Sequence, residues 1–572
     1  NGKVDRKALP APDVTQGVTY VAPVNETEQL LVEIWSELLA LDASQISTSA
    51  NFFALGGHSL LAIRLLSEIR KRIGRELSLA SLFQATDLRA LSQQLAESTR
   101  RSVPVIQPIV RTGELFKTSF SQQRLWFIDR LQGPGPAYNM PMAVRLHGRG
   151  DVQRLTAVFG TIVARHEILR TVYTEVDGEI YQRILPVAAA DVVCQVHDVS
   201  GLAAAARESA ALALVAQESQ RAFDLSQDVM LRISYVRLSG SEGVLVLNMH
   251  HIASDGWSMA VLAEEFFHLY GHQGAELASL PLQYVDYAHW QREYLAGPAL
   301  TAQLGYWEQQ LSEVPMLHSL PLDHPRPLMK QHVAGRVRGV LPAAVGLGLQ
   351  ALARAHQVTP FMVLHGALAL VLSRHSNSHD IVIGTPVANR LQAELEPLIG
   401  FFVNTLVLRL DTRQADVESY LSHVRAVHLG AQSNQDVPFE QLVERLNVVR
   451  NTGYTPLFQI MLTTNSEFGV GQRGATLSLP EVTVSAMADE HPSAKFDLTV
   501  SLDIDAQGVQ LEWIYDVSLF DESRIARLNT HLCRLLTDLS SLPATGPVAL
   551  NELSLLSAAE TQQLLHEFNG VS

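Results

Sequence analysis

Cysteine is almost absent from this chain of 572 residues, which contains only Cys194 and Cys533. The two lie far apart and match no metal-ligand spacing, so neither a disulfide framework nor a metal site is expected. Sparse cysteine is typical of a reducing compartment, and we therefore expect a cytoplasmic protein.

Basic residues are also in deficit. The chain has 43 lysines and arginines against 58 aspartates and glutamates, which gives a formal net charge of −15. A surface with this balance repels a phosphate backbone instead of neutralising it. No nucleic-acid partner is expected.

Long apolar runs are missing as well. The most apolar stretch, from about Phe361 to Leu372, is interrupted by His365. It is shorter than the roughly 20 apolar residues that a membrane-spanning helix needs, so no membrane partner is expected. No signal peptide opens the chain, and the residues around Asn1 indicate a start inside a longer polypeptide.

The chain does contain enough apolar residues for several cores, because 47% of its residues are hydrophobic and 18% are charged. Its length predicts roughly three to four folded units. Helical periods begin at Asn25 and at Leu60, separated by a loop with Gly56 and Gly57, and a third helix is expected over Leu88–Leu95. This part predicts a small all-α bundle.

From about Phe116 the pattern changes to mixed α and β. Strands are expected at Ala143–Leu146, Leu231–Val236 and Val244–Asn248, and they alternate with helical periods over Val152–His166 and Ser258–Tyr270. The stretch His289–Lys330 is typical of a crossover between two lobes, and a second α/β half follows from Gly335 to about Leu539. Alternation of this kind predicts α/β lobes.

A serine follows two glycines in Leu55–Leu60, whose sequence is Leu-Gly-Gly-His-Ser-Leu. The glycines permit a tight turn, and the apolar period from Leu60 places Ser59 at a helix start. Such a serine is often only an N-cap. The alternative is an exposed hydroxyl that carries a phosphate group, which a helix start favours.

Two adjacent histidines, His250 and His251, follow the apolar strand Val244–Asn248 and precede Asp255 and Gly256. Side chains alternate along a strand, so only one of the pair can face a given cleft, and the other needs a partner in the core. The same geometry argues against a shared metal ion. Taken alone, the pair fits either a structural or a catalytic role.

The segment Phe52–Leu60 resembles the core motif of peptidyl carrier domains in nonribosomal peptide synthetases. The resemblance implies 4'-phosphopantetheine attached covalently to Ser59 by a phosphopantetheinyl transferase. His58 could help that enzyme to dock or could simply be solvated. The segment Asn1–Arg6 resembles the last motif of an adenylation domain, in which Lys3 matches the lysine that contacts the acyl adenylate.

The pattern His-His, three residues, Asp-Gly is similar to the signature of the condensation superfamily, and further blocks of that family follow the family's order. They are Ser119–Phe127, Arg165–Thr171, Tyr284–Gln291, Ile399–Thr405, Asn434–Glu440 and Tyr454–Gln459. One departure is Asn434, where the family usually has histidine, and we interpret that position as structural.

These resemblances imply a multidomain fold: a small all-α carrier bundle, then a two-lobed α/β condensation domain like a pair of chloramphenicol acetyltransferase folds with a tunnel between them. Its expected parts are residues 1–24 as an adenylation tail and linker, 25–98 as the carrier, 99–114 as a linker, 115–290 as the N-terminal lobe, 291–548 as the C-terminal lobe, and 549–572 as the lead into a following adenylation domain.

The expected reaction joins the acyl group on Ser59 to the amine of an aminoacyl group on a downstream acceptor carrier. The family places the second histidine, His251, in the tunnel, where it could accept a proton or mainly orient the amine. His250 fills the structural place. Asp255 is expected to hold the loop through an ion pair with Arg170.

Three weaker site predictions complete the set. Gly256 is expected to allow either a close backbone approach or an unusual turn. Trp290 and Asn404 are candidates for lining the tunnel, although either could be part of the core. An upstream adenylation domain is the expected source of the donor.

Three other activities compete with this interpretation. An epimerisation domain shares the histidine motif, but carriers that feed it usually have aspartate where this chain has His58, and the block Asp436–Glu440 favours condensation. A heterocyclisation domain would carry aspartates at the histidine pair, and a non-catalytic docking platform would lack the motif. Because His250–His251 is the only adjacent histidine pair, we expect a donor of L configuration.

Overall fold

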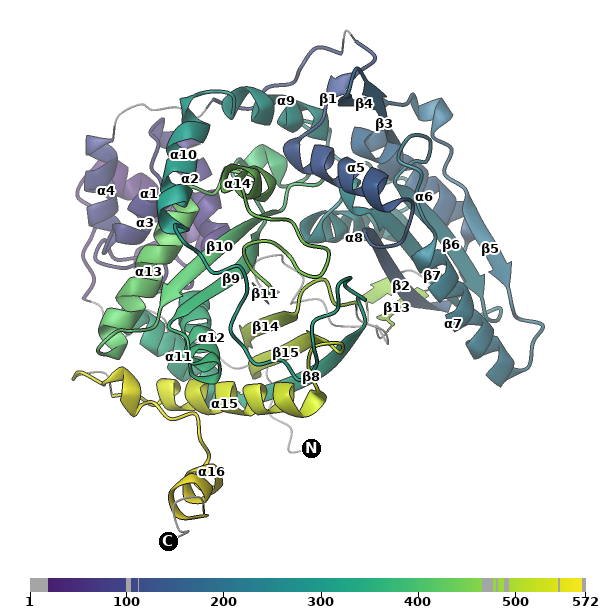
Figure 1. Cartoon of the computed structure of the whole chain (residues 1–572). Coiled ribbons are helices and arrows are strands. Elements are labelled where there is room, and N and C mark those ends of the chain that lie inside the picture. The colour runs from purple at the N-terminus through teal and green to yellow at the C-terminus, as the bar shows by residue number, and fades with distance from the viewer. Residues whose placement is uncertain are drawn as a thin grey trace, which may run out of the picture.

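The computed structural model describes residues 19–98, 104–111, 113–464, 477–479, 482–487, 493–543 and 546–567. A small helical domain lies against one side of a larger α/β body (Figure 1), whose described residues form two six-stranded sheets and a three-stranded one. The adenylation-like segment Asn1–Arg6, with Lys3, lies outside the described residues.

The helical domain forms because its sequence supplies caps and apolar faces at the right positions. Its helices are α1 (Glu26–Leu39), α2 (Ser59–Ile73), α3 (Leu79–Gln84) and α4 (Leu88–Glu97). Asn25 caps α1, and Gly74 ends α2 in the left-handed conformation with φ 72°. Trp35 and Leu65 are among the residues buried in its core. The three predicted helices are confirmed, while the short α3 was not predicted.

The N-terminal lobe contains a six-stranded sheet in the order β12-β13-β2-β7-β6-β5. Its strands are β2 (Asn139–Gly148), β5 (Cys194–Asp198), β6 (Leu231–Arg237), β7 (Glu242–His250), β12 (Leu477–Leu479) and β13 (Val482–Ala486). The three predicted strands lie within β2, β6 and β7, and are confirmed. The helices of this lobe are α5 (Phe120–Gln132), α6 (Val152–Arg165), α7 (Ala204–Gln220) and α8 (Gly256–Gly271).

A smaller sheet in this lobe joins β1 (Phe116–Lys117), β4 (Glu179–Ile184) and β3 (Thr171–Val176). Two helices, α9 (Tyr284–Tyr294) and α10 (Pro298–Gln310), then lead toward the second lobe. They occupy the first part of the predicted crossover, so the chain passes between the lobes in helical form.

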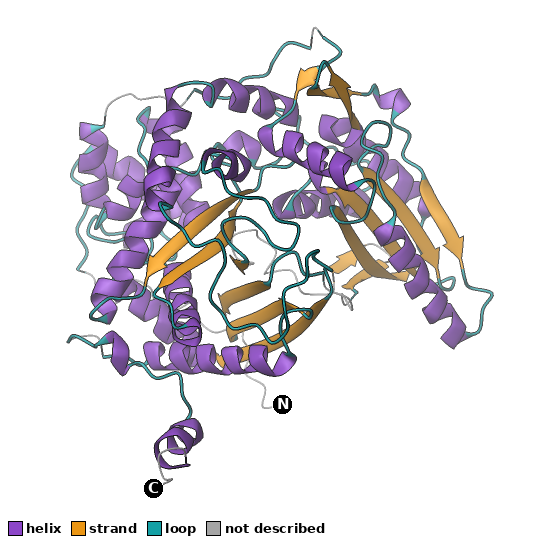
Figure 2. Ribbon diagram, in the orientation of Figure 1, coloured by secondary structure: helices purple, strands orange, loops and turns teal. Residues whose placement is uncertain are grey.

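The C-terminal lobe contains the second six-stranded sheet, in the order β10-β9-β11-β14-β15-β8. Its strands are β8 (Ala334–Pro342), β9 (Asp380–Val387), β10 (Asn404–Asp411), β11 (Ile460–Thr463), β14 (Leu498–Asp505) and β15 (Gly508–Asp516). Its helices are α11 (Ala343–Ala355), α12 (Pro360–Ser376), α13 (Val417–Ser433), α14 (Phe439–Arg445), α15 (Glu522–Ser540) and α16 (Ala558–Gln562). Figure 2 shows the strands gathered in separate groups with helices around them.

The C-terminal half of the chain adds a segment to the sheet of the N-terminal lobe. Strand β13 pairs with β2 in antiparallel register, with Val484 opposite Leu146, and β12 pairs with β13. Residues 477–479 and 482–486 therefore complete the sheet of the N-terminal lobe. This pairing departs from the predicted division at residue 290, which assigns both strands to the C-terminal lobe.

Among the described helices, none is by itself long and apolar enough to span a membrane. Only α11 and α12 taken together pass that test, and they are bent by 103° relative to each other.

Candidate carrier and condensation sites

Ser59 is the first residue of α2, and the turn before it depends on two glycines. Gly56 has φ +107°, and a Cβ on Gly57 would lie 2.5 Å from the ring of Phe52. The cap of α2 is His58, whose Nδ1 accepts a hydrogen bond from the main-chain N–H of Leu61 at 3.4 Å. The interpretation of Ser59 as the N-cap is therefore wrong.

The hydroxyl of Ser59 forms no hydrogen bond with any residue that the structure describes. It lies at the positive end of a helix of 15 residues, where the field favours an attached phosphate. A side chain with no structural task at this position fits the covalent attachment of phosphopantetheine. The next residue, Leu60, packs against the core of the N-terminal condensation lobe, so the attachment end of α2 faces that domain.

His250 ends strand β7 and is buried, with 2% of its surface exposed. Its Nδ1 accepts a hydrogen bond from the main-chain N–H of Ile252 at 3.1 Å, and its ring meets the edge of Phe223 at 5.8 Å. Burial, followed by the charges of His251 and Arg232, lowers the pKa of His250 to about 3. His250 is therefore a neutral histidine that shapes the turn. Its partner in the core is the main chain of Ile252, and such a partner was predicted for one of the two histidines.

His251 begins the turn after β7 and is held by its main chain, whose N–H donates to the carbonyl of Tyr138 at 2.9 Å. Its ring centroid is 4.6 Å from that of Phe401. Its Nδ1 has no hydrogen-bond partner among the described residues. The residue is half-buried as a whole, while its Nδ1 atom is buried.

The electrostatic surroundings keep the imidazole of His251 uncharged. Burial, and then the positive charge of Lys495, lower the pKa of His251 to about 4, while Asp255 opposes this shift. At neutral pH one ring nitrogen can therefore accept a proton or a hydrogen bond, while the other carries the N–H. Lys495 was not predicted, because it lies 244 positions beyond His251 and carries no spacing signal.

Asp255 holds the loop together through both carboxylate oxygens. One accepts hydrogen bonds from the N–H and hydroxyl of Ser258, at 2.9 and 2.7 Å, and caps α8. The other accepts from the main-chain N–H groups of Phe402 and Val403, at 2.9 and 3.0 Å. Asp255 thus braces the loop after His251, and its bonds reach across to the C-terminal lobe.

The ion-pair partner of Asp255 is Arg390, whose Nη2 lies 3.3 Å from the carboxylate. The prediction of Arg170 is wrong. Arg170 instead donates to the main-chain carbonyls of Leu185 and Ala164, at 2.8 and 3.4 Å. Arg170 follows α6 in the N-terminal lobe, and its guanidinium is engaged by backbone there.

The remaining predicted site residues lie in three different settings. Gly256 starts α8 and does not have a positive φ, so the unusual turn expected there is wrong and only the close approach stays a prediction. The amide of Asn404 bonds to Gln435, Val437 and Phe439 main-chain groups at 2.9 to 3.0 Å, which braces that block. Trp290 donates to the carbonyl of Pro104 at 2.7 Å and so fixes the interdomain segment.

Asn434 has the structural role that was predicted. Its side-chain amide donates to the carbonyl of Gly430 at 2.8 Å, and its own carbonyl accepts from the indole of Trp307 at 2.8 Å. These contacts join α13 to α10. The asparagine that replaces the usual histidine therefore lies where it links two helices.

Together these features define a carrier bundle with a free serine at a helix start, beside a two-lobed body with an uncharged histidine at the lobe junction. Residues 29–95 match the family model "Phosphopantetheine attachment site", and residues 114–565 match "Condensation domain". The chain belongs to the condensation domain family of nonribosomal peptide synthetases, and it carries a phosphopantetheine-binding carrier domain before that domain. Its enzymatic part is an amide-bond-forming acyltransferase.

The chain is similar to parts of larger bacterial synthases. It is 39% identical over its whole length to a linear gramicidin synthase of Brevibacillus parabrevis, of which it covers 7%. It is 37% identical, again over its whole length, to the dimodular nonribosomal peptide synthase of Bacillus subtilis (strain 168), of which it covers 24%. The chain thus spans a small fraction of these curated relatives.

Solved structures agree with the fold. The crystal structure of the X-domain from teicoplanin biosynthesis matches 79% of this chain and all of that chain, with a TM-score of 0.69 and 27% identity. The first condensation domain of the calcium-dependent antibiotic synthetase matches 78% of this chain and all of that chain, with a TM-score of 0.61 and 19% identity. The predicted carrier bundle followed by a two-lobed α/β condensation domain is confirmed.

Proposed function

We propose that Ser59 carries the phosphopantetheine arm and that His251 serves peptide-bond formation between the acyl group held there and the amine of an aminoacyl group on a downstream acceptor carrier. When bound, the arm supplies a thiol that holds the acyl group as a thioester. An upstream adenylation domain supplies the L-aminoacyl or peptidyl donor. The observation that carries the proposal is the imidazole of His251, a half-buried residue that lies beside Phe401 where the two lobes meet.

The role of His251 follows from its protonation. A pKa of about 4 leaves the imidazole neutral at neutral pH, with one N–H and one unprotonated nitrogen, so the unprotonated nitrogen can accept the proton that the amine loses when it attacks the acyl carbon. A well-placed base contributes roughly 10²–10⁴-fold to such a step. The imidazole can instead accept a hydrogen bond that orients the amine. His250, which is buried and already bonded, supports the turn.

The test uses the chain with Ser59 fully loaded and a charged acceptor carrier in excess, with the dipeptide followed by intact-protein mass spectrometry. We expect His251→Ala to slow the reaction roughly 100-fold or more. His251→Asn separates the two roles, because an amide accepts a hydrogen bond but is not basic. If His251→Asn keeps most of the rate of dipeptide formation, the histidine orients the amine. If His251→Asn is as slow as His251→Ala, the histidine is the base.

The matched control is His289→Ala, which removes a histidine whose side chain is 46% exposed on α9. It is expected to leave the rate unchanged. A fully active His251→Ala chain would overturn the assignment of His251.

A non-catalytic docking platform is a second candidate, because an X-domain of similar fold was solved in a complex with OxyB from teicoplanin biosynthesis. The complete histidine motif of this chain and the uncharged state of His251 favour catalysis. A wild-type chain that loads Ser59 and yet forms no dipeptide with any acceptor would favour the platform.

A further inference from the structure

The carrier touches the C-terminal condensation lobe through an aromatic residue. Phe83 of α3 is 6% exposed and belongs to the core of that lobe. Its ring stacks on Phe53 of the carrier, with centroids 4.4 Å apart and planes at 7°. The guanidinium of Arg425, on α13, donates to the carbonyl of Phe83. Helices α3 and α13 therefore lie side by side (Figure 1).

The second contact is ionic and lies on α2, close to the attachment end. The Nε of Arg64 is 3.2 Å from each carboxylate oxygen of Glu396. The two side chains are 42% and 19% exposed. Arg64 follows Ser59 by five positions, so this pair fixes the helix turn next to the proposed arm.

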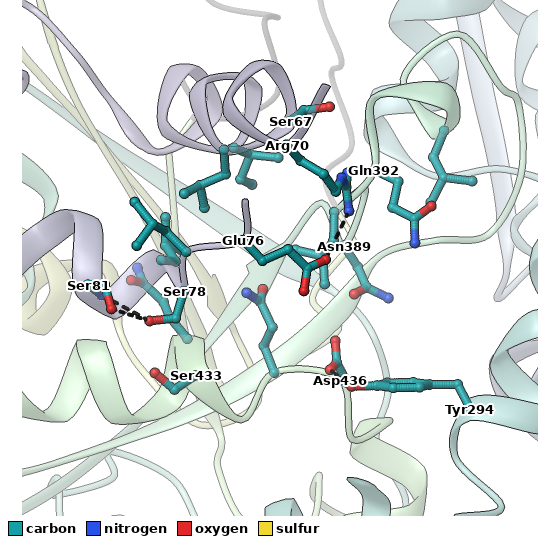
Figure 3. Close-up of a pocket in the computed structure, with 18 of the residues that line it drawn as sticks. Ser67, Arg70, Glu76, Ser78, Ser81, Tyr294, Asn389, Gln392, Ser433 and Asp436 are labelled. Carbon is teal, nitrogen blue, oxygen red and sulfur yellow. Dashed lines mark hydrogen bonds and ion pairs between the residues drawn. The ribbon is translucent and has the colours of Figure 1, made fainter. Parts of the chain in front are cut away.

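Between the two contacts the domains are apart. A cavity of about 730 Å³ is lined by α2, α3 and α4 on the carrier side, and on the other side by residues from α9, from the 389–395 segment and from positions 432–436. Figure 3 shows Ser67, Arg70 and Glu76 of the carrier across this space from Asn389, Gln392 and Asp436. Many of the lining side chains are polar. Leu60, Phe53 and Leu79 of the carrier also pack against the condensation cores. An interface made of separate contacts around such a cavity resembles a transient interface more than a permanent one.

Glu396 is presented from a fixed backbone. Its carbonyl accepts a hydrogen bond from the indole N–H of Trp257 at 2.8 Å and another from Arg390 at 3.3 Å. A short helical turn, Ala393–Leu395, immediately precedes Glu396. The carboxylate therefore needs little ordering when a carrier arrives, which favours recognition by this group.

We propose that the Arg64–Glu396 ion pair is the recognition contact through which this condensation domain accepts its donor carrier, with Phe83 as the apolar anchor. The partner that fits is a helical carrier with a cation five residues after the attachment serine and an aromatic residue on α3. Charge complementarity at an interface sets specificity and association rate more than affinity. The inference rests on the proposed role of Ser59 as the donor attachment site.

The test reverses the charges. Because residues 99–114 tether the carrier at a high effective concentration, neutralising one partner is too mild, and a repulsive pair is needed. Each chain is loaded on Ser59 until intact mass shows completion, and single-turnover dipeptide formation is then measured with an acceptor carrier. We expect Arg64→Glu and Glu396→Arg each to slow the reaction roughly tenfold, and the double reversal to recover most of the rate.

Two controls locate the effect. Lys71→Glu makes the same charge change on an exposed residue of α2 that forms no ion pair within the described part of the chain, and it should keep the wild-type rate. A free aminoacyl pantetheine thioester, given as donor to each variant in a Ser59→Ala background, bypasses the carrier. All variants should use that donor equally well.

Three results would overturn the proposal: Arg64→Glu no slower than Lys71→Glu, a double reversal no faster than either single one, or equal slowing with the free thioester. If Arg64→Glu prevents folding and hence loading, Glu396→Arg, which lies outside the carrier, decides the matter alone. Failure of the proposed function would look different, because the wild-type chain would then not load or would form no dipeptide.

Discussion

Asp255 and Arg390 form an ion pair that joins the two condensation lobes, and their side chains are only 1% and 2% exposed. Arg390 also donates to the hydroxyl of Ser258 at 2.8 Å and to the carbonyls of Leu395 and Leu398. The loop that follows His251 is thus held by a guanidinium from the other lobe. The position of the histidine therefore depends on how the lobes meet.

Removing Arg390 should destabilise the condensation domain strongly. Arg390→Met leaves the carboxylate of Asp255 buried without its cation, and breaking such a pair costs about 3–5 kcal/mol. We expect a clear fall in the melting temperature and in the rate of dipeptide formation. Arg170→Met is the control, because that side chain bonds only to carbonyls in its own lobe, and a smaller loss of about 1 kcal/mol is expected. Equal losses in the two variants would contradict the assignment of Arg390.

Ser59 should be the residue that accepts the arm. Incubation with coenzyme A and a phosphopantetheinyl transferase is expected to add one phosphopantetheine to the wild-type chain and none to Ser59→Ala, as measured by intact mass. Ser67→Ala, on the same helix, is the control and should load normally. An arm added to the Ser59→Ala chain would place the attachment site elsewhere.

Acid should weaken the C-terminal lobe through two histidines in its core. Nδ1 of His365 lies 2.7 Å from Nε2 of His428, and the two residues are 0% and 3% exposed. Burial lowers the pKa of His428 to about 3, and burial followed by His428 and His423 lowers the pKa of His365 well below its usual value. His423 itself lies near Asp411.

The direction in which pH changes the folding stability follows from proton binding in the folded and unfolded states. Both histidines are uncharged when folded, whereas unfolding lets them bind protons below a pH of about 6.5. Their stabilising contribution is therefore complete above pH 6.5 and is lost as pH falls toward 3, by up to about 1.4 kcal/mol per pH unit for each group. We expect the double variant His365→Leu/His428→Leu to lose less melting temperature between pH 7 and 5 than wild type, while His289→Gln keeps the wild-type slope. Identical slopes in all three chains would show that the buried pair does not control acid sensitivity.

The donor residue should keep its L configuration. Only one adjacent histidine pair occurs in the sequence, and the interdomain segment 99–114 is far too short to hold an epimerase. An L-aminoacyl group loaded on Ser59 should therefore appear as L at the donor position of the dipeptide, resolved by chiral chromatography. A product mainly of D configuration would reveal an epimerase activity.

Much of the site could be predicted from local sequence. The Gly56–Gly57 turn and the apolar period after Leu60 place Ser59 at a helix start, and the apolar run of β7 brings His250 and His251 to the end of a strand. The assignment of His58 rather than Ser59 as the cap could not be predicted, because it depends on the backbone angles at the turn. The backbone conformation of Gly256, which begins α8 without a positive φ, could not be predicted for the same reason.

The sequence by itself determined the helices, the main strands and the order of the reactive residues, because caps, glycines and apolar periods act over a few neighbouring positions. Only the tertiary structure decided which distant groups meet. Arg390 lies 135 positions from Asp255, and Glu396 lies 332 positions from Arg64. Likewise, the pairing of β13 with β2 follows from the path of the chain between the lobes. Pairing over such separations leaves no periodic signal, since it depends on packing of the whole core rather than on local conformation.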